Sequence, residues 1–167
     1  MIFNSQRNGH NMNKIIFLDM DGPIVNLRSC VANEQDGLLT YFDPTACKLL
    51  ERVIKCGMNS RFLSDVKIVF ISTWIDQYSR NGFIRMFASA GFNHIRHNIH
   101  DDYRIDDTHN RQQSIEKWLS EHPDVSHYVI VDDETYDDPN AIKVCAYNGI
   151  SFQNYQEIME CFGYDDI

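Results

Sequence analysis

The sequence contains three short apolar runs, and each is followed directly by polar residues that could take part in catalysis. These residues are Asp19 and Asp21 after the first run, Ser72 and Thr73 after the second, and Asp132 and Asp133 after the third. If the runs form neighbouring parallel strands, their carboxyl ends meet at the edge of the sheet where ligands usually bind. The spacing therefore predicts that the three groups of side chains converge on one crevice.

The carboxylates in these groups indicate a metal site. Asp19-x-Asp21-Gly22 taken alone is equally typical of a solvated turn, in which Asp and Gly are common. A second acidic pair after another apolar run favours the metal site, because carboxylates that repel each other need a cation in order to lie close together. A site built only from oxygen ligands prefers Mg²⁺. We therefore predict Mg²⁺ as the cofactor.

The spacing of apolar residues predicts alternating strands and helices that would position these side chains. Strands are expected at 14–18, 67–71, 128–131 and about 142–146, helices at 44–56, 83–90, 111–122 and about 154–161, and a short strand with a polar loop in 92–110. The helix at 44–56 has Asp43 and Pro44 as N-cap and first residue, and Gly57 as C-cap. This alternation predicts a three-layer α/β/α sandwich with a mainly parallel, Rossmann-like sheet.

The chain is expected to form a single domain. Its 167 residues, of which 43% are hydrophobic, are an ordinary amount of material for one core. We assign residues 14–167 to this domain and expect the polar residues 1–13 to be a loose arm. Residues 24–43 leave room for no more than a flap beside the crevice, so any cap over the site is minimal.

Charge and cysteine content restrict the partners and the compartment. The 15 Lys and Arg against 24 Asp and Glu give a net charge of −9, which disfavours membrane surfaces and extended nucleic-acid tracks. The five Cys include no Cys-x-x-Cys pair, and the N-terminus lacks an apolar signal segment, so a cytoplasmic protein with reduced thiols is expected. No apolar run approaches the ~20 residues of a membrane-spanning helix. The sequence indicates no oligomeric state.

The ordered set of motifs resembles the haloacid dehalogenase (HAD) superfamily of phosphohydrolases. The segments similar to its motifs I to IV are Phe17-Leu18-Asp19-Met20-Asp21-Gly22, Ile71-Ser72-Thr73, Arg111 at a predicted helix start, and Val131-Asp132-Asp133. The resemblance runs from about Lys14 to Gly149. Residues 111–119 and 128–133 look like a small branch found beside RNA-repair enzymes, and the segment DMDG also looks like the deoxyribonucleotidases.

The resemblance implies a role for each matched acidic residue. Asp19 would attack phosphorus and form an aspartyl-phosphate, while Asp21 would protonate the leaving group and later activate water. Mg²⁺ would be held by Asp19, the carbonyl of Asp21 and Asp132, and Asp133 would act as a ligand through water.

The resemblance leaves two choices open for the groups that bind the phosphoryl oxygens. Ser72 and Thr73 both suit the hydroxyl position of motif II. Arg111 is favoured as the basic residue because it would start a helix, whose N-terminus also attracts an anion, and Lys117 is the alternative. The competing interpretation of Arg111 is an exposed surface charge without a role.

Two residues beside the motifs affect the expected activity. Pro23 stands where the family usually has Thr or Val, and it removes a backbone N–H from a loop beside the phosphate, which suggests a slower or altered enzyme. Trp74 is a candidate substrate contact that could stack on a base or sugar, and plain packing under a loop is the alternative.

A histidine-rich segment invites a second metal-site hypothesis. It contains His94, His97, His100 and His109, with Asp101, Asp102, Asp106 and Asp107 nearby. We favour a solvated polar loop, because no helix or strand is expected to fix the geometry of these side chains.

Together these features predict a Mg²⁺-dependent phosphomonoester hydrolase that works through an aspartyl-phosphate. The preferred substrate is a nucleotide or a nucleic-acid terminal phosphate. One alternative is a phosphatase for sugar phosphates or other small metabolites. Another is a catalytically weak module that binds a phosphorylated ligand or a basic protein.

Overall fold

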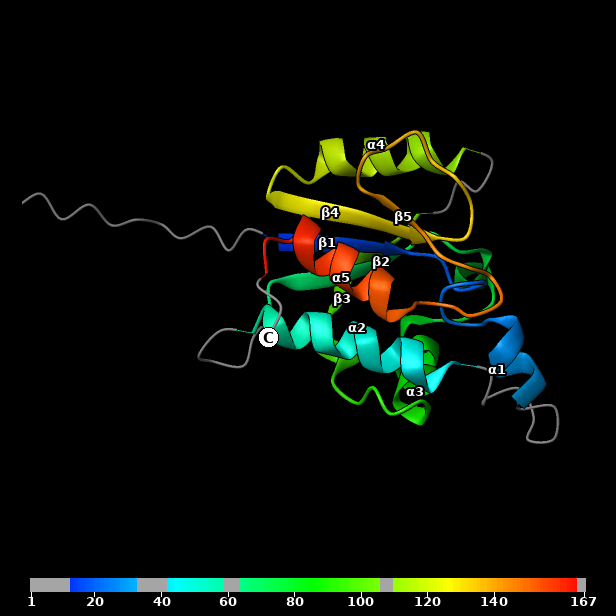
Figure 1. Ribbon diagram of the computed structural model, residues 1–167. Helices are drawn as coiled ribbons and strands as arrows, with labels where there is room; N and C mark the ends of the chain where they lie inside the picture. The colour runs from blue at the N-terminus through cyan, green and yellow to red at the C-terminus, as the bar shows by residue number, and fades with distance from the viewer. Residues whose placement is uncertain (1–12, 33–41, 59–63, 106–109, 165–167) are drawn as a thin grey trace, which may run out of the picture.

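Five parallel strands form the centre of the protein in the computed structural model, which describes residues 13–32, 42–58, 64–105 and 110–164 (Figure 1). The strands are β1 Asn13–Leu18, β2 Val66–Phe70, β3 Ile99–Arg104, β4 Val125–Asp132 and β5 Ala141–Lys143. Their order in the sheet is β3-β2-β1-β4-β5, so β1 is central. The predicted mainly parallel α/β sheet is confirmed.

Helices cover both faces of this sheet. The helices are α1 Leu27–Ala32, α2 Pro44–Cys56, α3 Arg80–Ser89, α4 Arg111–Glu121 and α5 Phe152–Cys161, with short 3-10 helices η1 Thr73–Asp76 and η2 Ile95–His97. Figure 1 shows α2, α3 and α5 on one side of the sheet and α4 on the other. This is the three-layer arrangement expected from the sequence.

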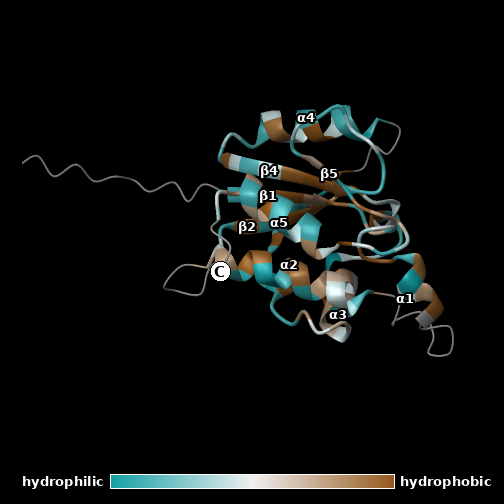
Figure 2. Cartoon of the chain, in the orientation of Figure 1, coloured by the Kyte–Doolittle hydropathy of each residue, from teal (hydrophilic) through white to brown (hydrophobic). Residues whose placement is uncertain are grey.

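Alternation along the strands divides the core between the two faces. Ile16 and Leu18 of β1 belong to the larger cluster, which packs against α2, α3 and α5, whereas Ile15 and Phe17 belong to the smaller one under α4. Successive strand residues point to opposite faces, and β1 is buried on both. Figure 2 shows the hydrophobic colour concentrated in the strands, with hydrophilic segments on the outer helices and loops.

Local capping explains where the helices begin. Helix α2 has the predicted limits, because the Asp43 carboxylate accepts hydrogen bonds from the backbone N–H groups of Thr45 and Ala46, and Gly57 follows its end. Helix α3 begins three residues before Phe83 because the Ser79 hydroxyl accepts a bond from the N–H of Gly82.

Several sequence-based boundaries need correction. The last strand ends at Lys143, before the expected limit, because Cys145 enters a turn in which its carbonyl accepts bonds from the N–H groups of Asn148 and Gly149. Asn13, placed in the arm, is the first residue of β1, and the rest of the arm lies outside the described residues. Within 24–43 the structure describes a six-residue helix, α1, while residues 33–41 lie outside the described part.

None of the helices in the described ranges has the length and apolarity needed to cross a bilayer.

Candidate active site

The three strand ends meet at one edge of the sheet. Leu18 is in register with Phe70 of β2 and with Val131 of β4. The N–H of Asp19 continues this pairing by donating to the carbonyl of Val131 at 3.0 Å. The polar residues that follow these strands therefore face one crevice, as parallel pairing predicts.

Three carboxylates lie together in this crevice. One oxygen each from Asp19, Asp132 and Asp133 lies within 4.8 Å of the others, the only cluster of potential metal ligands found among the described residues. Asp19 and Asp132 are only 4% and 1% exposed. Three acidic side chains so close to one another, two of them buried, form a strong local negative field.

Asp19 lies in an environment that disfavours its charged form. Burial, together with the charge of Asp132, raises the pKa of its carboxyl to about 7, even though Arg111, the N–H of Met20 and the Ser72 hydroxyl all favour the charged form. Its Oδ1 atom is buried and has no hydrogen-bond partner among the described residues. A buried carboxylate oxygen without a partner is costly and marks a place where a ligand can bind.

The position of the Asp133 side chain depends on a glycine in the neighbouring turn. Burial and the neighbouring Asp132 raise the pKa of the Asp133 carboxyl. Gly22 has a φ of +89°, and a Cβ atom at this position would lie 2.8 Å from Cγ of Asp133. Gly22 therefore provides both a left-handed turn and the space that Asp133 occupies.

Pro23 is buried within the same turn. Its carbonyl accepts a hydrogen bond from the N–H of Ile150 at 3.1 Å, and the N–H groups of Ile24 and Val25 both donate to the carbonyl of Met20. Neighbouring N–H groups thus close the turn without a donor at position 23.

Arg111 supplies the positive charge of the site. It is the first residue of α4, and its Nη1 lies 3.0 Å from Oδ2 of Asp132, 3.7 Å from Oδ2 of Asp19 and 3.8 Å from Oε2 of Glu134. Burial lowers the pKa of the guanidinium, but the Asp19 and Asp132 charges and a hydrogen bond with Tyr136 outweigh burial and raise it. Arg111 is therefore held between the carboxylates as a permanent cation.

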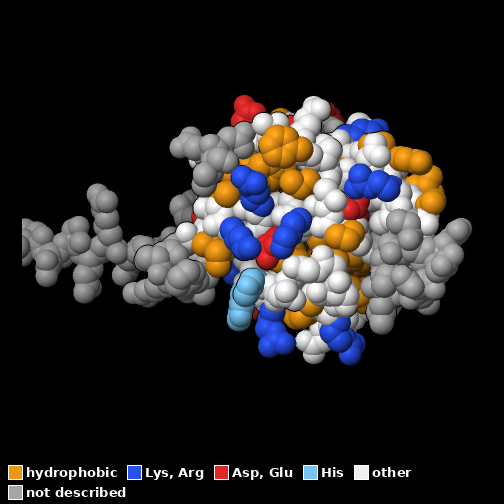
Figure 3. Space-filling model, turned by 60° about the horizontal axis from the view of Figure 1, so that its bottom comes forward, with side chains coloured by type: hydrophobic (Ala, Val, Ile, Leu, Met, Phe, Trp, Pro, Cys, Tyr) orange, Lys and Arg blue, Asp and Glu red, His pale blue; other side chains and the backbone are white. Residues whose placement is uncertain are grey.

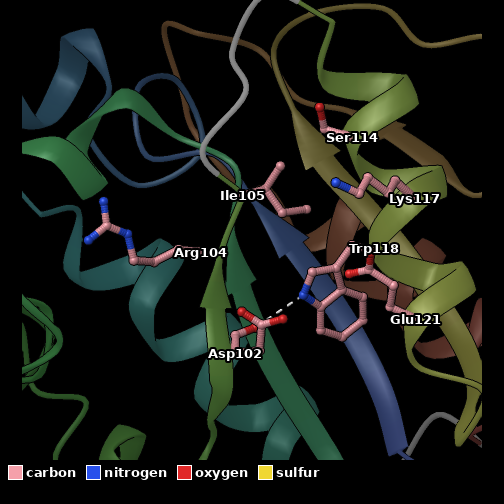
Figure 4. A pocket seen from close by; sticks show the side chains of 7 residues that line it. All are labelled: Asp102, Arg104, Ile105, Ser114, Lys117, Trp118 and Glu121. Carbon is pink, nitrogen blue, oxygen red and sulfur yellow. Dashed lines mark hydrogen bonds between the residues drawn. The ribbon is translucent and has the colours of Figure 1, made fainter.

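Lys117, the alternative to Arg111, lies elsewhere. Figure 4 shows it in a hollow between β3 and α4, beside Trp118, whose indole N–H donates to the carbonyl of Asp102 at 3.2 Å. Of the two basic candidates, the structure brings only Arg111 to the carboxylates.

Tyr136 belongs to the site although sequence reasoning did not find it. Its hydroxyl donates to Oδ2 of Asp132 at 2.5 Å, and burial together with this bond raises the pKa of the phenol. The N–H of Glu134 donates to Oδ1 of the same carboxylate at 3.0 Å. Both donors come from the loop after β4, and they fix the orientation of the Asp132 side chain.

The two hydroxyls of motif II have different environments. Ser72 is 1% exposed, its Oγ accepts a hydrogen bond from the N–H of Trp74 at 3.4 Å, and its hydroxyl interacts with Asp19. Thr73 is exposed. Ser72 is therefore the one placed beside Asp19.

Asp21 lies at the mouth of the crevice, outside the carboxylate cluster. It is exposed, and its Oδ2 accepts a hydrogen bond from Nε1 of Trp74 at 3.0 Å. The role predicted for its backbone carbonyl as a Mg²⁺ ligand stays a prediction. Trp74 remains a candidate substrate contact, with its N–H directed at Asp21.

The histidine-rich segment is more ordered than the expected polar loop. His100 lies on strand β3, and its ring contacts Trp118 and His122 at centroid distances of 5.0 and 5.2 Å. The short strand expected within 92–110 is β3, which pairs with β2 at the edge of the sheet. The solvated-loop interpretation is therefore wrong for His100, because it lies on this strand. No second metal cluster is found in the parts of the chain described, and residues 106–109 lie outside them.

Comparison with known families agrees with the resemblance seen in the motifs. Residues 15–151 match the family described as the HAD domain in Swiss Army Knife RNA repair proteins, which indicates a phosphatase-type hydrolase. Neither the curated proteins nor the solved structures contain a match. The matched range includes β2 to β5, β1 from Ile15 onward, and every residue of the carboxylate cluster. The chain belongs to the family of HAD domains found in Swiss Army Knife RNA repair proteins.

Proposed function

We propose that this protein is a Mg²⁺-dependent phosphomonoesterase that forms an aspartyl-phosphate at Asp19 and acts on a nucleotide or a nucleic-acid terminal phosphate. The observation that carries the proposal is the cluster of Asp19, Asp132 and Asp133 at the strand ends, with Arg111 among them. Phosphoryl transfer depends chiefly on positioning and on neutralising charge, and this arrangement provides both.

The residues present fit a bound Mg²⁺ ion. Oδ1 of Asp19 is buried without a hydrogen-bond partner among the described residues, and the cluster offers only oxygen atoms. The side chains of Asp19, Asp132 and Asp133 would hold the ion, together with the carbonyl of Asp21. When bound, Mg²⁺ supplies positive charge to the phosphoryl oxygens and lets the carboxylates stay ionised side by side.

Asp19 and Asp21 carry out the two chemical steps. A carboxylate oxygen of Asp19 bonds to phosphorus while the bond from phosphorus to the ester oxygen breaks, and the departing oxygen takes a proton from the Asp21 carboxyl. Water then bonds to phosphorus and gives its proton to Asp21 as the bond to Asp19 breaks. The products are an alcohol and inorganic phosphate, and both side chains return to their starting state.

The other polar groups of the crevice hold the reacting atoms. Arg111 and Ser72 lie beside Asp19, where they would donate hydrogen bonds to the phosphoryl oxygens. Tyr136 and the N–H of Glu134 hold the Asp132 carboxylate in place. Fixed groups of this kind do not need to reorganise during the reaction.

The substrate class is supported by the family and by the mouth of the site. The matched family occurs in RNA repair proteins. In the described residues, the insert after β1 contains one helix of six residues, and Asp21 at the mouth is exposed. An exposed Asp21 at the mouth supports access of a phosphate at the end of a larger molecule.

Phosphate release from a substrate panel tests this function. The panel contains 3′- and 5′-phosphorylated oligonucleotides, nucleoside monophosphates and sugar phosphates, each with Mg²⁺ and with EDTA. We expect release from a nucleotide substrate that requires Mg²⁺ and falls at least ~10³-fold in Asp19→Asn, because the nucleophile is lost. Asp101→Asn, which changes a carboxylate that is 99% exposed, is the matched control with unchanged activity.

Other results would lead to different conclusions. Full Mg²⁺-dependent activity in Asp19→Asn would exclude the aspartyl-phosphate. Preference for sugar phosphates would indicate a metabolite phosphatase. Ligand or partner binding by a wild-type protein that turns over no substrate would indicate a binding module.

A further inference from the structure

The indole of Trp74 connects the two motif loops that follow β1 and β2. Its Nε1 donates to Oδ2 of Asp21 at 3.0 Å, and no other side chain among the described residues donates a hydrogen bond to this carboxylate. Asp21 is exposed, so its side chain has little packing to fix its direction. The bond to Trp74 is therefore the main restraint that this carboxylate receives from the described residues.

The indole itself is held firmly. Trp74 lies in η1, where the Ser72 hydroxyl accepts a bond from its backbone N–H, and its carbonyl accepts bonds from the N–H groups of Gln77 and Tyr78. Its ring contacts those of Phe42 and Tyr78 at centroid distances of 5.9 and 5.4 Å. A ring fixed on two sides and at its backbone presents its N–H in one direction.

The chemistry of the indole assigns different tasks to the two oxygens of Asp21. An indole N–H can donate a hydrogen bond but cannot accept one. When Asp21 carries a proton, Oδ2 remains the acceptor of the Trp74 bond, and the proton resides on Oδ1. When Asp21 is ionised, the same bond keeps Oδ1 as the oxygen that receives a proton.

We infer that Trp74 is a positioning residue for proton transfer, which holds Asp21 so that one oxygen, Oδ1, passes the proton to the leaving group and takes it back from water. This inference rests on the proposed phosphomonoesterase function. It gives Trp74 a task in the reaction that does not depend on stacking against a substrate base.

The role of an acid catalyst depends on the leaving group. A phenolate that carries nitro groups departs without a proton, whereas an alkoxide, such as the sugar oxygen of a nucleotide, needs one. Loss of a correctly held Asp21 therefore slows alkyl phosphates much more than activated aryl phosphates. A loss of folded protein, by contrast, slows both in the same proportion.

The test compares Trp74→Phe with Trp118→Phe. Both variants replace an indole with a benzene ring and remove one indole hydrogen bond, but Trp118 donates to the carbonyl of Asp102 between β3 and α4. For each protein, kcat/KM is measured on dinitrophenyl phosphate and on the best nucleotide substrate, because this constant reports the steps through formation of the aspartyl-phosphate. Circular dichroism and a thermal melt verify folding.

We expect Trp74→Phe to lower kcat/KM on the nucleotide by ~10- to 100-fold and on dinitrophenyl phosphate by less than ~3-fold, since positioned acid catalysis contributes ~10²- to 10⁴-fold. Trp118→Phe should keep the wild-type ratio between the two substrates. Trp74→His, which retains a ring N–H near the same place, should recover part of the nucleotide activity.

A double-mutant cycle with Asp21→Asn completes the test. If Trp74 acts through Asp21, the double variant is no slower on the nucleotide than Asp21→Asn alone. Equal losses on both substrates in Trp74→Phe, or losses that multiply in the double variant, would overturn the inference while the proposed function stands. A wild-type protein that releases phosphate from no substrate would overturn the proposed function and the inference with it.

Discussion

Asp19 is placed where an ionised carboxylate is unfavourable. Its burial and its closeness to Asp132 both oppose ionisation, and Arg111 offsets only part of this effect. A nucleophilic carboxylate must nevertheless be ionised to attack phosphorus. Under the proposed function, the site therefore reduces the stability of the metal-free fold while it keeps a nucleophile ready.

This conflict predicts how the stability of the protein depends on pH. The pKa of Asp19 is about 7 in the fold and near 3.8 in the unfolded chain. Between these values the folded state binds more protons than the unfolded state, so stability falls as pH rises from about 4 to 7. In EDTA, Asp19→Asn should be the more stable protein at pH 8, by an amount on the order of a few kcal/mol, and this advantage should shrink towards pH 4.

Urea unfolding of both proteins across this pH range measures the effect. Asp101→Asn is the control, because a fully exposed carboxylate should give a difference from wild type that stays small at every pH. An Asp19→Asn advantage that is constant between pH 4 and pH 8 would contradict the assigned cause.

Most of the charged residues of the site can be predicted from the sequence, and physical reasons explain the omissions. Asp19, Asp132 and Asp133 follow apolar runs, so the strand pattern alone brings them together. The sequence does not predict the role of Tyr136, because its contact with Asp132 depends on how an irregular loop turns back after β4. The sequence does not distinguish Ser72 from Thr73, since a shift of one residue at a strand end decides which hydroxyl faces the crevice.

At the scale of elements, the turn between β1 and α1 determines the geometry of the mouth. The N–H of Gly22 donates to the carbonyl of Val25 at 2.8 Å, and this closes the turn that presents Asp21. The same glycine leaves the space occupied by the Asp133 side chain. One small residue thus connects the loop after β1 with the loop after β4.

Gly22→Ala and Gly91→Ala form a matched pair that isolates this contact. Both glycines have a φ near +90°, but a Cβ at Gly91 would meet nothing within 4 Å, whereas one at Gly22 would collide with Asp133. Gly91→Ala should lower the free energy of unfolding by about 1 kcal/mol through backbone strain alone. Gly22→Ala should lower the free energy of unfolding by a further ~1–3 kcal/mol and should also weaken phosphatase activity. Urea unfolding measures the stability of the two variants, and phosphate release measures their activity. If Gly22→Ala and Gly91→Ala change both properties equally, the contact with Asp133 is unimportant.

Elements with strong local signals were predicted best. Helix α2 has an N-cap, a proline at its first position and a glycine at its end, and its limits agree with the prediction. Strand β5 has only three residues. Just beyond its end, the N–H of Val144 donates a hydrogen bond to the carbonyl of Asp132. A strand so short lacks an alternation that could fix its ends. The pairing of β3 with β2 joins residues far apart in the sequence, so the local pattern of apolar residues does not predict it.

At the scale of the whole molecule, the net charge of −9 is unevenly distributed. Figure 3, which brings the side of α2 and α3 forward, shows Lys and Arg side chains prominently on that face. On α2, Lys48 and Lys55 have exposed side chains, whereas Glu51 between them is buried and paired with both. Three acidic side chains, Asp19, Asp132 and Asp133, lie together where a cation would bind, so the net charge alone does not describe the field that a phosphate meets.

Mg²⁺ should stabilise the protein, and more strongly at higher pH. At a concentration about 100-fold above its dissociation constant, the ion would add ~2.7 kcal/mol to the free energy of unfolding. This corresponds to an increase of roughly 5–10 °C in Tm for a chain of this size. Because protons compete for Asp19, whose pKa is about 7, the increase should be larger at pH 8 than at pH 6. Thermal melts with Mg²⁺ and with EDTA measure it, and Asp132→Asn should abolish it. The same increase in Asp132→Asn would place the bound ion elsewhere.

The central position of β1 also has a consequence for synthesis on the ribosome. β1 is made first, yet its neighbours in the sheet are β2 and β4, and β4 begins only at Val125. An emerging chain can pair β1 with β2 but leaves the other edge of this apolar strand unpaired until β4 has been translated, and such edges fold slowly and associate with one another. Asp19 meets Asp132 only when that last neighbour arrives. Assembly of the sheet and assembly of the carboxylate cluster are thus the same late event, and nascent chains that stop before β4 should need chaperones and bind no metal at this site.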